Sequence, residues 1–351
     1  MKHVLLAIAA LTGAAAASAQ SSVTLFGVLD ASITRLSSDT ASNTGMSNGE
    51  LSSSRLGFRG IEDLGGGLKA GFWLEGGVGV DNGGSSYRFD RRSTVSLMGN
   101  FGEVRLGRDK LASYLNIEAF DPFGDIGVAG NGLNNILGSA TGAVGTAEGS
   151  HPKRSNNIIS WISPNFSGFH GQLQYSFGER ASNDPNRDRG NAITGRVGYQ
   201  AGKLDLGLGY GEISGGTDTV ETTYKAYNLG ASYDFGMIKP MLLLASERGA
   251  GRRVDAWTLG ASAPVGAAGE VRVAWTRFNT KNVADADTDK LAIGYIHKLS
   301  KRTALYGMVA RISNENNATR GFATSSSALA SPTFTAGDSA TGYSVGLRHT
   351  F

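Results

Sequence analysis

The chain has 351 residues, and its 33 basic and 30 acidic residues leave a formal charge of only +3 at pH 7. The basic residues are scattered singly, which argues against a nucleic-acid-binding face, and the lack of cysteine excludes disulfides and thiolate metal sites. Glycine is abundant, at 51 residues, and no linker or long charged tract divides the chain, so we expect one large domain with little helix.

The first residues predict export. Lys2 and His3 precede an apolar run at residues 4–11, and small residues follow it and end at Ala19. This is the pattern of a cleaved secretory signal peptide, and the apolar run is too short to cross a bilayer as a helix. We expect residues 1–19 to be removed and residues 20–351 to form the mature domain. That removal takes away one lysine and no acidic residue, which leaves a formal charge of +2.

Beyond residue 19 the chain shows alternation in place of long apolar runs. Val23, Leu25, Leu29 and Ile33 fall on one face of an extended segment, and the period of two returns near residues 172–177, 227–235, 257–259 and 291–299. No run approaches the roughly 20 apolar residues that a membrane helix needs. The alternation fits either a soluble β-sandwich or a membrane β-barrel.

The spacing of turn signals favours the barrel. Short turns and longer polar stretches alternate along the chain, as in outer-membrane barrels, and fifteen connections predict a sixteen-stranded antiparallel transmembrane β-barrel. The short turns are expected at 63–67, 99–102, 163–168, 201–203, 236–239, 266–269 and 300–301, and the longer stretches at 37–49, 82–89, 109–153, 181–188, 215–221, 249–252, 280–286 and 315–339. In lipid every backbone polar group must be paired, so the last strand, which ends at Phe351, should close the barrel against the first.

Short segments in a fixed order carry a resemblance to a known family. The most specific is SRLGFRGIEDLGGGLKA at residues 54–70, and others lie at 21–25, 101–108, 121–124, 163–169, 300–303 and 346–351. Together they resemble the trimeric general porins of Gram-negative bacteria, in the branch with arginine-rich constrictions. The resemblance implies a homotrimer in outer-membrane lipid that passes small hydrophilic solutes and favours anions. It also implies folding by the outer-membrane assembly machinery, with Phe351 as the closure and assembly signal, and no cofactor.

The same resemblance implies a pore constriction. A loop at about residues 109–153 would fold inward, and Arg55, Arg91 and Arg154 would supply cations to the narrowest point. Trp161 and Ile162 stand where the family usually has tyrosine and a polar residue, and residues 126–147 contain no acid. These departures leave open which acidic residues face the arginines.

Strand parity predicts the lumen charges independently, because residues opposite the apolar lipid face must point inward. The inward acids are Asp30, Glu75 and Glu103, and they are outnumbered by inward cations at Arg55, Arg59, Arg105, Arg196, Arg272, Lys290 and Arg348. Rings of Arg or Lys are how pores favour anions. For Arg196 and Arg272, local pairing with a lumen acid or a loop carbonyl fits as well.

The loop contributes acids of its own. Glu118, Asp121 and Asp125 would set a field across the constriction, or they would only cap turns around Pro122 and Gly124. Tyrosine and tryptophan residues on the outer face would form interfacial girdles or pack at a subunit contact.

Catalytic and metal-binding motifs in the sequence lack the surrounding structure or the spacing that such sites need. Residues 342–346 (GYSVG) match a nucleophile-elbow pattern but lie within the last predicted strand, with no helix after them. The four histidines of the mature chain, at 151, 170, 297 and 349, are too widely spaced for a metal site. We therefore expect no enzyme. The alternatives are a barrel enzyme, which needs a clustered Ser/His or Asp/His set, and an adhesin or β-solenoid, which needs a short repeat.

Overall fold

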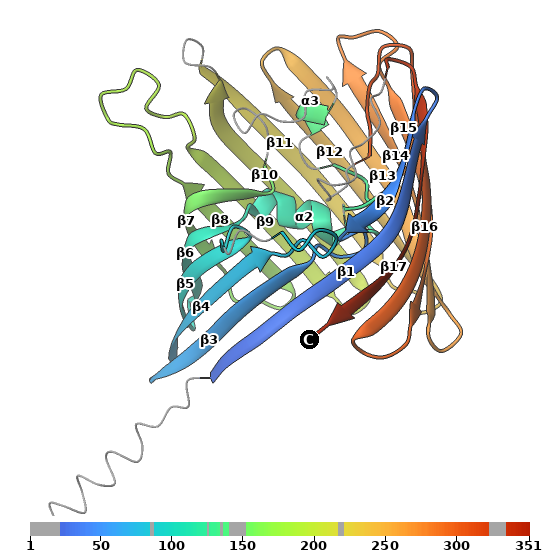
Figure 1. The fold of residues 1–351 in the computed structure, drawn as a ribbon. Coiled ribbons are helices and arrows are strands. Elements are labelled where there is room, and N and C mark those ends of the chain that lie inside the picture. Colours follow the sequence, from blue (N-terminus) through green and yellow to red (C-terminus); the bar gives the residue numbers. More distant parts are fainter. Residues whose placement is uncertain are drawn as a thin grey trace, which may run out of the picture.

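The computed structural model describes residues 22–84, 88–124, 126–133, 136–139, 152–216, 221–322 and 335–351. The predicted signal peptide lies outside these residues. The strands form one antiparallel sheet that closes on itself into a barrel (Figure 1). In chain order the elements are β1 (Ser22–Ser38), β2 (Ser42–Asn48), β3 (Arg55–Gly65), β4 (Leu68–Gly77), β5 (Arg92–Gly99), β6 (Gly102–Lys110), α2 (Ala112–Ala119), α3 (Ile136–Ser139), β7 (Arg154–Ile162), β8 (Phe169–Ser176), β9 (Ala192–Ala201), β10 (Leu204–Gly216), β11 (Glu221–Tyr233), β12 (Lys239–Gly249), β13 (Arg252–Val265), β14 (Gly269–Lys281), β15 (Thr288–Lys298), β16 (Thr303–Asn314) and β17 (Ser339–Thr350).

The seventeen strands make a sixteen-stranded barrel, as predicted, because β2 and β3 together occupy one position in the wall. β2 pairs with residues 31–37 of β1, and β3 pairs with residues 22–28 of the same strand. Between them the chain leaves the sheet at residues 49–54. The carboxylate of Asp30 holds this interruption by accepting hydrogen bonds from the backbone N–H groups of Leu51 and Ser52, at 3.0 and 2.6 Å.

The predicted long connection at residues 37–49 is wrong. Residues 37–38 continue β1 and Ser42–Asn48 form β2, so that only residues 39–41 connect the two strands. The segment SNTGMSN has no apolar alternation, and its polar character is typical of a loop. Ladder hydrogen bonds between backbone groups hold it in the sheet, and they do not depend on that alternation.

The last strand closes the barrel against the first, which confirms the predicted edge. β17 pairs with β1 from Val28 opposite Thr350 to Ser38 opposite Ala340. Phe351 adds two backbone hydrogen bonds to Gly27, at 3.0 and 3.1 Å. Its ring covers Gly27 so closely that a Cβ there would lie 2.4 Å from the ring. The first and last strands are thereby joined by main chain and side chain together.

The two faces of the wall differ as a membrane barrel requires. Leu25, Ile33, Leu229 and Leu291 are exposed on the outside, whereas inward threonines and serines of the same sheet are buried. Within the described residues no helix is long and apolar enough to cross a membrane. Ser344 of the GYSVG motif lies inside β17, where Thr34 donates a hydrogen bond to its hydroxyl at 3.1 Å.

The connection between β6 and β7 enters the barrel. Its helix α2 lies inside the wall in Figure 1 and contacts β8 to β11. Polar side chains outside the connection hold its backbone. Gln174 of β8 accepts from the N–H of Ala112 at 2.6 Å, Glu247 of β12 accepts from Leu137 at 3.1 Å, and Glu50, between β2 and β3, accepts from Val128 at 2.7 Å. The described part of the loop is therefore fastened to widely separated strands.

Candidate functional site: the pore constriction

Three arginines meet where the wall faces the loop. Arg55 begins β3, Arg91 directly precedes β5 and Arg154 begins β7. Arg91 Nε donates to Glu75 Oε1 at 2.7 Å, and Arg55 Nε lies 3.8 Å from the same oxygen. Arg154 Nε donates to the backbone oxygen of Arg91 at 2.8 Å. The structure thus brings together the three arginines that the sequence singled out, and we call them with Glu75 the arginine cluster.

The arginine cluster keeps an excess of positive charge. Among the described residues, Glu75 is the only carboxylate within ion-pair distance of its three guanidinium groups. Arg55 and Arg154 are otherwise held by neutral backbone oxygens, those of Ser53 at 3.2 Å and Arg91 at 2.8 Å. Neutral acceptors fix the direction of a guanidinium without cancelling its charge. The side chains of Arg55 and Glu75 are 30% and 12% exposed, so Arg55 in particular remains open to the lumen.

The loop acids are placed differently from one another. Glu118 in α2 binds Lys110 Nζ through both carboxylate oxygens, at 2.7 and 2.6 Å, and interacts electrostatically with Arg55 and Arg154. Asp121 is buried, and it accepts hydrogen bonds from the N–H groups of Phe123 and Asn131 within the loop. Asp125 lies outside the described residues. Glu118 is therefore the described loop acid that faces the arginine cluster.

Several of the predicted lumen cations are paired. Arg105 lies between Glu103 at 2.8 Å and Asp109 at 2.6 Å. Arg272 binds Glu270 at 2.6 Å and the backbone oxygen of Pro122 at 2.7 Å, so it joins the wall to the loop. Lys290 is buried beneath the loop and donates to the backbone oxygen of Gly130.

The remaining predicted cations have weaker partners. Arg196 Nη2 lies 3.3 Å from His170 Nε2 and interacts electrostatically with Asp205. Arg348 Nη1 is 3.4 Å from Ser52 Oγ. Arg59 packs on the rings of Phe26 and Trp73 and makes no ion pair with any described residue.

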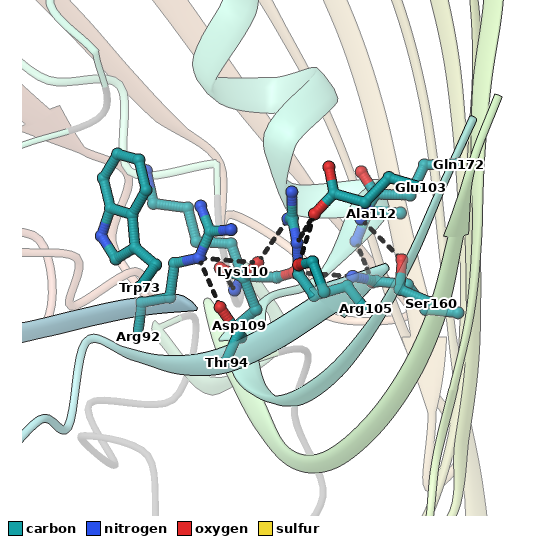
Figure 2. A network of polar contacts seen from close by, with 12 residues as sticks. Trp73, Arg92, Thr94, Glu103, Arg105, Asp109, Lys110, Ala112, Ser160 and Gln172 are labelled. Atoms are coloured by element: carbon teal, nitrogen blue, oxygen red, sulfur yellow. Dashed lines mark hydrogen bonds and ion pairs between the residues drawn. The ribbon is translucent and has the colours of Figure 1, made fainter. Parts of the chain in front are cut away.

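Sequence reasoning missed Arg92, Asp109 and Trp73. Arg92 reaches from the Trp73 ring, 4.5 Å away, to Asp109, 3.6 Å away (Figure 2). The inward parity of Thr94 and Ser96 on β5 could have identified Arg92. Asp109 lies four residues from Arg105 on the same face of β6, and it was missed because the loop is predicted to begin at residue 109.

Comparison with known proteins identifies relatives over the whole chain. The model of the family described as Gram-negative porin matches residues 5–317. Outer membrane porin protein 32 of Delftia acidovorans is 40% identical over 100% of both chains. An outer membrane porin protein of Bordetella pertussis is 31% identical over 87% of this chain and 93% of that protein.

Solved structures agree with this. The anion-selective porin from Comamonas acidovorans superposes with a TM-score of 0.85 at 39% identity, over 95% of this chain and 100% of that one. A trimer form of OmpT from Vibrio cholerae, with a TM-score of 0.69 at 16% identity, covers 94% of this chain and 99% of that one and shares the fold.

Proposed function

This chain belongs to the Gram-negative porin family and forms an outer-membrane diffusion channel, and on that premise we propose that it favours small hydrophilic anions. The observation that carries the proposal is the arginine cluster, in which three guanidinium groups lie together and only one carboxylate, that of Glu75, pairs with them: Arg55 and Arg91 contact it, and Arg154 is held by the backbone oxygen of Arg91. The similar structure described as an anion-selective porin supports it.

The arginine cluster would select by charge without holding the solute. An anion that enters the constriction exchanges part of its hydration shell for guanidinium N–H groups, whereas a cation is repelled there. Arginine suits this role because its charge persists at any relevant pH and its planar fork matches a carboxylate or phosphate. Contacts at several weak positions let the solute leave again, so transport needs neither a cofactor nor a catalytic step.

The assembly is part of the proposal. We propose that residues 1–19 are cleaved on export, that the outer-membrane assembly machinery inserts the barrel into lipid, and that three copies associate. Mass spectrometry of the exported protein should give an N-terminus at Gln20. Light scattering on the detergent-purified protein should give three times the mass of one chain, and a monomeric mass would contradict the trimer.

The reversal potential of the refolded protein in a planar bilayer under a potassium chloride gradient tests the selectivity. We expect the parent to prefer chloride, and Arg55→Ala, Arg91→Ala and Arg154→Ala each to weaken that preference. Arg253→Ala is a matched control, because Arg253 is exposed and paired with Asp255 away from the arginine cluster. A parent that prefers cations would contradict the charge assignment. A folded barrel without conductance would remove the channel and revive the enzyme and adhesin alternatives.

A further inference from the structure

The lumen wall has a cleft between the arginine cluster and the short-turn end of the barrel. This cleft of about 420 Å³ lies over β3 to β6, and its lining includes Arg59, Trp73, Arg92, Glu103 and Arg105. Arg59 is four residues from Arg55 along β3, towards the short turn after Gly65, a distance of about 13 Å at the rise of a β-strand. A solute that has passed the constriction from the long-loop side therefore meets this cleft next.

Arg59 is the unpaired cation of the cleft. Its guanidinium lies 5.1 Å from the ring centre of Trp73 and 5.4 Å from that of Phe26. The two rings meet edge to face, 4.9 Å apart, and form an aromatic corner beneath it. Arg59 is exposed and makes no ion pair with a described residue, so its N–H fork is available to a ligand.

The other groups of the cleft are fixed in place. Trp73 Nε1 donates to Glu75 Oε2 at 3.2 Å, which anchors the indole to the arginine cluster. Arg92 packs on the same indole at 4.5 Å and is held by Thr94 at 3.0 Å. Figure 2 shows Arg92 extending between Trp73 and Asp109. The aromatic and cationic surfaces are thus positioned before any solute arrives.

We propose that this cleft is a subsite for planar aromatic carboxylates on their way through the pore. The carboxylate would pair with the fork of Arg59, and the ring would stack on the guanidinium planes and the aromatic corner. The volume is large enough for a single-ring acid. This inference rests on the proposed function, since the cleft would discriminate among anions that the arginine cluster admits.

Block of the chloride current tests the subsite with two probes of equal charge and similar size. Benzoate is planar and aromatic, and cyclohexanecarboxylate is neither. We expect the half-blocking concentration of benzoate to be about five-fold lower in the parent, the size of one modest ring contact. In Trp73→Leu and Arg59→Gln the half-blocking concentrations of the two acids should become similar. Arg196→Gln removes one cation from another part of the lumen and should leave the ratio unchanged.

Conservative variants and a second readout protect the test against misfolding. Trp73→Phe should keep part of the benzoate preference, and Arg59→Lys should keep the charge but lose the planar fork. In detergent, benzoate should alter the tryptophan fluorescence of the parent and have a much smaller effect on Trp73→Leu. Equal block by both acids in the parent, or a preference that survives Trp73→Leu and Arg59→Gln, would overturn the subsite.

The chloride-to-potassium selectivity of the same bilayers, measured without either acid, separates this inference from the proposed function. Anion selectivity with equal block by the two acids leaves the proposed function standing and removes the subsite. Cation selectivity removes the proposed function, and the fluorescence titration then decides the cleft by itself.

Discussion

Glu75 connects the parts of the constriction at the level of single residues. One of its carboxylate oxygens accepts from Arg91 and lies near Arg55, and the other accepts from the indole of Trp73. The same side chain therefore orders the arginines and subtracts one charge from them. In the proposed function, anion selectivity therefore depends both on the order that Glu75 gives to the arginines and on the charge that it removes.

Glu75→Gln should make the channel more anion-selective. The amide keeps the shape and an acceptor oxygen, but the arginine cluster gains one unit of net charge. In a salt gradient the reversal potential should move further towards the value for a purely chloride-selective pore. Glu212→Gln is the matched control, because Glu212 binds Tyr210 and Lys225 on the outer face and should not alter selectivity. A shift towards potassium would mean that Glu75 acts mainly by holding the arginines in place.

Parity predicted which side chains face inward but not which of them stay charged towards the pore. The inward assignments of Arg55, Arg59 and Arg105 needed only the exposed positions of Leu56, Phe58 and Leu106 beside them. That Arg105 is neutralised by Glu103 and Asp109 depends on how these side chains pair with one another, which the alternation of β6 does not show. That Lys290 is covered depends on where the loop lies.

At the level of elements, the loop between β6 and β7 packs against a row of small residues on the inner face of the barrel wall. Gly207 and Gly230 are direct cross-strand partners, and Phe120 of the loop packs on both. The row of small residues continues along the wall through residues that are cross-strand partners of one another: Gly260, Ala274, Ala292, Ala310 and Gly342. Missing side chains let the loop approach the sheet closely, and its buried apolar residues then pack against the wall.

Gly230→Ala should displace the loop. A Cβ at Gly230 would lie 1.9 Å from Phe120, a ring buried among neighbouring side chains. Overpacking of this kind costs about 1 to 3 kcal/mol, and here it displaces the loop that is predicted to narrow the pore. We expect a lower melting temperature on a heat-modifiability gel and a changed single-channel conductance. Gly195→Ala should change neither, because its nearest neighbour would be 3.4 Å away. A displaced melting temperature with the parental conductance would show that the loop does not limit the current.

The strands were predictable from local sequence patterns, whereas the inward loop was predicted only through the family resemblance and its contacts were not predicted. A strand is indicated by alternation over about ten residues and by turn residues at its end, and both signals lie within a short stretch of sequence. The exception, β2, is polar on both faces and shows no such pattern. The loop is held by pairs far apart in the chain, such as Asn116 with Asn228 at 2.7 Å. No local pattern encodes a contact across that separation.

At the scale of the whole molecule, closure depends on the meeting of β1 and β17. Phe351→Ala should lower the stability of the barrel by about 1–2 kcal/mol, less than truncation of a fully buried phenylalanine, because the ring is partly exposed. The loss exposes the backbone at Gly27, so refolding yield should fall as well. Phe166→Ala, an exposed turn residue, is the control. Equal yields and melting temperatures for the two variants would contradict a role of the Phe351 ring in closure.

Because the whole chain is nearly neutral, we expect the chloride preference to depend on salt concentration. With a formal charge of only +3 at pH 7, the molecule has little long-range field, and selectivity must come from charges concentrated at the pore. Mobile ions screen such charges over a Debye length of about 10 Å at 0.1 M salt and about 3 Å at 1 M. The chloride preference should therefore fall steeply as a fixed-ratio gradient is moved from about 0.1 M to about 1 M. The chloride preference should fall less in Glu75→Gln, where the arginine cluster keeps more net positive charge. A chloride preference that does not change with salt would contradict a contribution of the screened field and would leave the direct guanidinium contacts as its whole source.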